Sequence, residues 1–126
     1  MRAVDTNVLV RLITRDDVRQ TASAESFIDK GAWVPVLALA DAAWRLARVY
    51  GLSSKDLASA IEMLLNHQDL VLQDPETVSA ALELFRAKPA LGFSDCLMLQ
   101  LARKAGHLPL GTFDRNLAKV EGTQKL

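Results

Sequence analysis

The sequence predicts an α/β protein built around a short, mostly parallel sheet. Short apolar strings alternate with longer segments of helical period, as in β-α units. Gly51, Pro75, Pro89 and Gly106 fall at the ends of the helical segments. Half of the 126 residues are hydrophobic, which is enough for one core. We therefore expect a single domain over residues 1–126, without repeats or linkers.

Four short apolar strings indicate strands: Arg2–Val4, Trp33–Val36, Leu70–Leu72 and Leu108–Gly111, with the C-terminal tail as a candidate edge strand. Proline lies near the end of the second string, where a missing backbone N–H is tolerated. Helical segments lie between these strings. A short helix follows the turn Asp5-Thr6-Asn7, and further helices are expected at Asp16–Lys30, Leu37–Tyr50, Ser53–His67, Pro75–Lys88, Phe93–Ala105 and Asp114–Lys119.

Composition excludes several classes of protein. The 15 basic and 15 acidic residues cancel, so no basic excess indicates a general nucleic-acid or membrane binder. A lone cysteine, Cys96, rules out an intrachain disulfide and suits a reducing cytosol. The charges of Asp5 and Arg11 interrupt the region where a signal peptide needs an apolar core. The longest uncharged run, Gly31–Ala40, is too short to cross a bilayer. A cytoplasmic protein without a membrane partner is expected.

Four aspartates stand where the predicted fold has little need of them. Asp5, Asp41 and Asp114 follow apolar strings, and Asp95 opens an apolar helix. Taken singly, each has a simple structural explanation, as a helix cap or, for Asp41 with Arg45, as a surface ion pair. However, the strand-to-helix turns of a parallel sheet share one edge. Four carboxylates gathered there would repel one another and require a cation, and oxygen ligands suit Mg²⁺ or Mn²⁺.

A divalent ion held by these acids would favour attack of water on a phosphodiester. Asn7 and Thr112 are candidates for supporting polar groups, because each lies two residues from one of the acids. Arg45 and Arg115 are candidates for contact with RNA phosphates. The leading hypothesis is therefore a metal-dependent nuclease.

Four segments carry a resemblance to a known family. The opening VDTNVLVRL, the segment VPVLALADAAWRLARVYG, the helix start FSDCLMLQLA and the late TFDRNLAK are together similar to a PIN-domain ribonuclease, more narrowly a VapC-type toxin of a type II toxin–antitoxin system. The resemblance implies a three-layer α/β/α fold and Mg²⁺- or Mn²⁺-dependent endoribonuclease activity. It implies homodimerisation and a small VapB-like antitoxin partner. It also maps the family's acids onto Asp5, Asp41, Asp95 and Asp114, supported by Asn7 and Thr112.

Two positions depart from the family pattern, and they leave an alternative open. The family's second acid is usually glutamate, where this chain has the shorter Asp41, and relatives often carry aspartate where this chain has Gly92. The alternative is a non-catalytic PIN-like module that binds a partner through its acidic groove. A phosphatase is disfavoured, because Asn7 stands where it needs a second aspartate. A receiver domain is disfavoured, because Val4 precedes Asp5 where an acidic pair is needed. No glycine-rich phosphate-binding loop is present.

Overall fold

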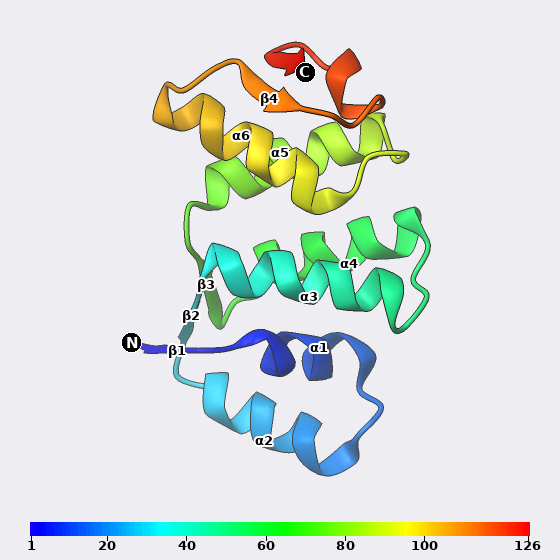
Figure 1. Cartoon of the computed structure of the whole chain (residues 1–126). Coiled ribbons are helices and arrows are strands. Elements are labelled where there is room, and N and C mark those ends of the chain that lie inside the picture. The colour runs from blue at the N-terminus through cyan, green and yellow to red at the C-terminus, as the bar shows by residue number, and fades with distance from the viewer. The chain divides into compact units, whose positions relative to one another are not determined.

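The computed structural model describes all 126 residues, which group into two compact units, Met1–Pro75 and Glu76–Leu126. Each unit has its own helices and its own parallel strands (Figure 1).

The first unit contains a three-stranded parallel sheet. Its strands are β1 (Arg2–Ala3), β2 (Ala32–Val34) and β3 (Leu70–Leu72), in the order β1-β2-β3. Arg2 pairs with Ala32, and Trp33 pairs with Val71. The backbone N–H of Val4 donates to the carbonyl of Trp33 at 3.0 Å, which continues the pairing up to Asp5. The parallel direction confirms the expected β-α organisation and places the three strand ends at one edge.

Four helices connect these strands: α1 (Thr6–Thr14), α2 (Val18–Ile28), α3 (Val36–Arg48) and α4 (Ser54–Asn66). Three begin at side-chain caps, because Asp5, Asp17 and Ser53 each accept a hydrogen bond from a first-turn backbone N–H. The expected strand Trp33–Val36 was wrong at its end. Pro35 is the N-cap of α3, and its φ of −64° suits the start of a helix.

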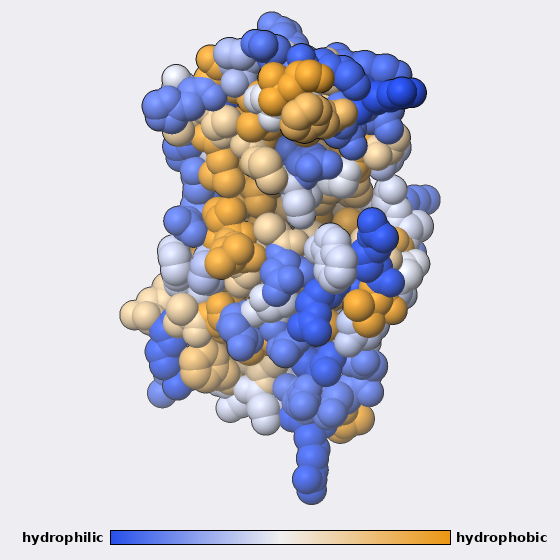
Figure 2. All heavy atoms as spheres, in the orientation of Figure 1, coloured by the Kyte–Doolittle hydropathy of each residue, from blue (hydrophilic) through white to orange (hydrophobic).

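Hydrophobic residues at helical spacing form the core of the first unit. Leu39 and Leu46 of α3, with Ile61 and Leu64 of α4, are each 1% exposed. Not every apolar side chain is buried, however. Leu37 is 79% exposed and Trp44 is 55% exposed, and hydrophobic spheres are visible at the surface over α3 (Figure 2). Trp44 therefore lies at the surface of α3 although its neighbours in the sequence are apolar.

The second unit consists of two long helices, a 3₁₀ turn and two short strands. They are α5 (Pro75–Ala87), whose first residue closes the first unit, then α6 (Phe93–Ala105), β4 (Leu110–Thr112), η1 (Leu117–Lys119) and β5 (Thr123–Lys125). The rings of Phe85 and Phe93 pack edge to face, with centroids 6.0 Å apart. The C-terminal tail pairs with β4 in parallel, so the expected edge strand is present. The expected strand Leu108–Gly111 begins two residues later than predicted.

Candidate acidic metal site

Asp5 lies in the turn between β1 and α1. Its backbone is extended, with φ −97° and ψ −176°, and its Oδ1 accepts a 3.3 Å hydrogen bond from the N–H of Val8. The capping interpretation of Asp5 is thus correct, but it accounts for one oxygen only. Oδ2 has no hydrogen-bond partner in the chain, and the residue is exposed. One carboxylate oxygen of Asp5 therefore remains available to a ligand.

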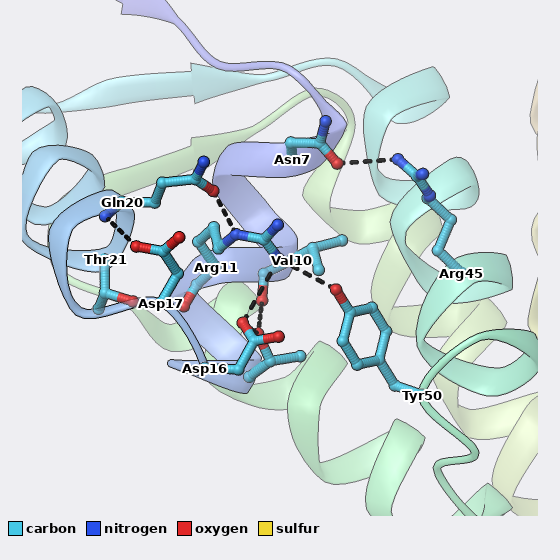
Figure 3. A network of polar contacts seen from close by, with 10 residues as sticks. Asn7, Val10, Arg11, Asp16, Asp17, Gln20, Thr21, Arg45 and Tyr50 are labelled. Atoms are coloured by element: carbon cyan, nitrogen blue, oxygen red, sulfur yellow. Dashed lines mark hydrogen bonds and ion pairs between the residues drawn. The ribbon is translucent and has the colours of Figure 1, made fainter.

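Two contacts from neighbouring residues of α1 bring α3 to the Asp5 turn. The hydroxyl of Thr6 donates to Oδ2 of Asp41 at 2.8 Å. One turn further along α3, Nη1 of Arg45 donates to Oδ1 of Asn7 at 2.8 Å (Figure 3). Arg45 therefore bonds to the amide of Asn7 and forms no ion pair with Asp41. The exposed Asp41 carboxylate lies beside the residue that follows Asp5.

Asp95 and Asp114 form the corresponding pair in the second unit. Asp95 lies in the first turn of α6 and is partly buried. Burial, and then the charge of Asp114, raise the pKa of the Asp95 carboxyl above its usual range, while a backbone hydrogen bond at Gly92 acts in the opposite direction. The negative charge of Asp114 therefore disfavours ionisation of Asp95.

A hydrogen bond from backbone to side chain connects Asp114 to Thr112. The N–H of Asp114 donates to Oγ1 of Thr112 at 3.0 Å, and Oδ1 of Asp114 accepts from the N–H of Leu117 at 2.8 Å. Thr112 thus supports the turn that carries Asp114. Arg115 follows directly, is exposed, and makes no hydrogen bond or ion pair with the chain. It is free to contact a phosphate.

The donor chemistry of the acids fits a hard divalent cation. Neither unit by itself gathers three His, Cys, Asp or Glu side chains into a group that would hold a metal. Each does supply two carboxylates, and oxygen ligands are those that Mg²⁺ and Mn²⁺ prefer. The one thiol does not compete, because Cys96 is buried and its pKa is raised to about 11. Oxygen donors without a soft ligand favour Mg²⁺ or Mn²⁺ over zinc.

We did not expect from the sequence that Arg11 connects neighbouring elements. Its Nε donates to Oε1 of Gln20, and its Nη1 donates to the hydroxyl of Tyr50 at 3.0 Å and approaches Asp16 at 3.4 Å (Figure 3). Arg11 thereby joins α1 to α2 and to the turn that follows α3. The available signal was its spacing from Asn7, since residues four apart share one face of a helix.

Carboxylates at the carboxyl ends of parallel strands define a class of α/β proteins whose ligands bind at that edge. A family model described as PIN domain matches residues 2–123. The chain therefore belongs to the PIN-domain family, and the expected PIN-like α/β/α fold class is confirmed. Domains of this family are generally nucleases that use divalent metal ions. Searches of curated proteins and of solved structures found no match. None of the helices has the length and hydrophobicity needed to cross a membrane.

Proposed function

We propose that this chain is a divalent-metal-dependent endoribonuclease in which Asp5, Asp41, Asp95 and Asp114 hold Mg²⁺ or Mn²⁺. The observation that carries the proposal is the pairing of the acids. Thr6 bonds Asp41 beside the turn of Asp5, and the charge of Asp114 acts on Asp95. Burial and the charge of Asp114 oppose ionisation of Asp95, and a cation beside these acids would offset that cost. Membership of the PIN family supports nuclease activity and RNA as the substrate.

In this proposal residues 1–126 act as one PIN-like domain, and its four acids hold the metal. The family match supports this, because it runs over both units. When bound, the ion polarises a phosphodiester and lowers the pKa of water. Asn7 and Thr112 support the site by holding Arg45 and the Asp114 turn. Arg115 contacts a phosphate of the RNA.

The biological role that we propose is that of the toxin in a toxin–antitoxin pair. The segments around Asp5, Asp41, Asp95 and Asp114 support it by their resemblance to VapC-type toxins. A homodimer in the cytoplasm and a small antitoxin that blocks the acidic site belong to the same proposal. Induced expression in bacteria should arrest growth with the native chain and leave growth unchanged with Asp5→Asn.

RNA cleavage by the purified protein tests the proposal. Single-stranded RNA should be cut in the presence of Mn²⁺ or Mg²⁺, and excess EDTA should stop the cutting. Asp5→Asn removes one negative ligand and should slow cleavage on the order of 10²-fold or more. Asp56→Asn is the matched control, because Asp56 is an exposed aspartate on α4. Equal cleavage by the native chain and Asp5→Asn, or none with either metal, would contradict the proposal.

A non-catalytic interaction module remains the second candidate, and Gly92 is the observation that favours it. A Cβ added at Gly92 would lie 3.7 Å from Oδ2 of Asp95, so the position beside this acid has room for a side chain and holds none. The shorter Asp41 also reduces the reach of the second acid. If this candidate is correct, the chain binds a partner through its acids and leaves RNA intact under every metal condition.

A further inference from the structure

A pocket of about 450 Å³ lies beside the turn of Asp5, entirely within the first unit. Asp5, Asn7 and Val8 line it from the start of α1, and Arg19, Ser23 and Phe27 line it from α2. Its volume falls within the range of about 300–1,000 Å³ that is typical of small-ligand sites. The pocket is thus continuous with one of the proposed metal ligands.

The wall between α1 and α2 is held in place by bonds within the protein. Arg11 and Gln20, which also line the pocket, are hydrogen-bonded to each other. The ring of Phe27 is fixed from outside by Arg2, whose Cζ lies 3.9 Å from the ring centroid and whose Nη2 donates to the Phe27 carbonyl at 2.9 Å. These contacts order the pocket before any ligand binds, which reduces the conformational entropy that is lost on binding.

Two polar side chains of the pocket have no partner within the protein. Arg19 and Ser23 are exposed and make neither a hydrogen bond nor an ion pair with the chain. A cationic guanidinium and a hydroxyl therefore face a ligand without losing an internal bond. Val8 and Phe27 add apolar surface. A negatively charged group attached to a flat ring matches this combination, since arginine binds phosphate and aromatic surfaces stack on bases.

We propose that this pocket binds one nucleotide of single-stranded RNA, next to the phosphodiester that is cut at the acids. The inference rests on the proposed function for the location of the cut. Arg19 pairs with the phosphate of the bound nucleotide, its base lies against Val8 and Phe27, and Ser23 with the amide of Gln20 contacts the base edge. Only an unpaired base can enter such a pocket, so duplex RNA is excluded.

Binding without cleavage tests the pocket separately from the enzyme. Labelled single-stranded RNA is titrated into the full chain in EDTA, with fluorescence anisotropy as the readout. Arg19→Gln should weaken binding about 3- to 10-fold and lower the slope of log affinity against log salt by about 1. Ser23→Trp fills the pocket and should weaken binding about 10-fold. Lys55→Gln and Ser59→Trp are controls on the exposed face of α4 and should bind like the native chain. Melting temperatures establish that all variants fold.

The outcomes separate this inference from the nuclease proposal. If Asp5→Asn stops cleavage but Arg19→Gln and Ser23→Trp bind like the native chain, the nuclease stands and the pocket inference is overturned. Equal affinity for duplex and single-stranded RNA overturns it as well. If the native chain cuts no RNA, the proposed function fails, while selective weakening by Arg19→Gln and Ser23→Trp still supports an RNA-binding pocket.

Discussion

The hydroxyl of Thr6 donates a 2.8 Å hydrogen bond to Oδ2 of Asp41, two residues that are 35 positions apart in the chain. Thr6 is the first residue of α1, and Asp5 immediately before it caps the same helix. One contact therefore places the second acid beside the residue that follows the first. It also occupies one oxygen of Asp41, so this carboxylate keeps its second oxygen for an ion.

Thr6→Val should weaken the binding of Mn²⁺, because it removes the hydrogen bond that orients Asp41. Loss of such a supporting bond typically costs about 10- to 100-fold in metal affinity. The free energy of unfolding should fall by about 1 kcal/mol. Calorimetric Mn²⁺ titration and urea denaturation measure the two effects. Thr6→Ser retains the hydroxyl and serves as the control. An unchanged Mn²⁺ affinity in Thr6→Val would show that the bond has no part in metal binding.

The metal-free protein should lose stability as the pH rises through the raised pKa of Asp95. Because the folded-state pKa exceeds the unfolded value of about 3.9, the carboxyl's contribution is fully present below pH ~3.9. That contribution disappears as the pH rises through the folded-state pKa, where burial and Asp114 oppose ionisation. Carbon-detected NMR titration gives the pKa directly. Asp114→Asn should lower it, and Asp95→Asn should flatten this part of the stability profile. An Asp95 pKa that does not change in Asp114→Asn would mean that the two acids are not close.

Gly92→Asp should strengthen metal binding by adding a carboxylate beside Asp95. The position can accept a side chain, because the φ of Gly92 is −74° and an added Cβ would meet Oδ2 of Asp95 at 3.7 Å. Gly92 is also the N-cap of α6, where aspartate and asparagine cap better than glycine by a few tenths of a kcal/mol. Gly92→Asn is therefore the matched control, since it caps without adding charge. Tighter Mn²⁺ binding should be specific to Gly92→Asp. Equal affinity in both variants would place position 92 outside the site.

Cys96 should be inert towards thiol reagents in the folded protein. The side chain is fully buried, and burial followed by the charge of Asp95 raises its pKa to about 11. The thiolate is the reactive form, so little of it exists at pH 8. Labelling with a chromogenic disulfide should be slow in buffer and rapid in guanidinium. Cys96→Ser should leave RNA cleavage intact. Fast labelling of the folded chain would show that α6 opens readily.

The features that could be predicted from the sequence are local ones. Caps such as Asp5 and Ser53 act on backbone groups three residues away, so their neighbours identify them. The end of β2 was misplaced because Pro35 suits either the end of a strand or the start of a helix. Contacts between distant segments were not predictable. The choice of Asn7 over Asp41 as partner of Arg45 depends on how α1 packs on α3, which no local pattern specifies.

The pocket illustrates the same limit. Each of its lining residues is unremarkable in the sequence, and Arg11 would be taken for a solvated surface charge. Only the packing of α1 against α2 places Arg19 and Ser23 beside Asp5. By contrast, the four acids were identified from their positions after apolar strings. The strand before Asp114 pairs with β5 in a separate sheet from β1-β2-β3, so a metal site that includes all four acids remains part of the proposal.

Mn²⁺ binding by single-aspartate variants tests the central claim most directly. Electron paramagnetic resonance measures free Mn²⁺ in titrations of the native chain, of Asp5→Asn from the first unit and of Asp95→Asn from the second. If acids of both units hold one ion, each variant should bind Mn²⁺ much more weakly than the native chain. Asp56→Asn should bind it normally. Native affinity in either Asp5→Asn or Asp95→Asn would contradict a shared metal site.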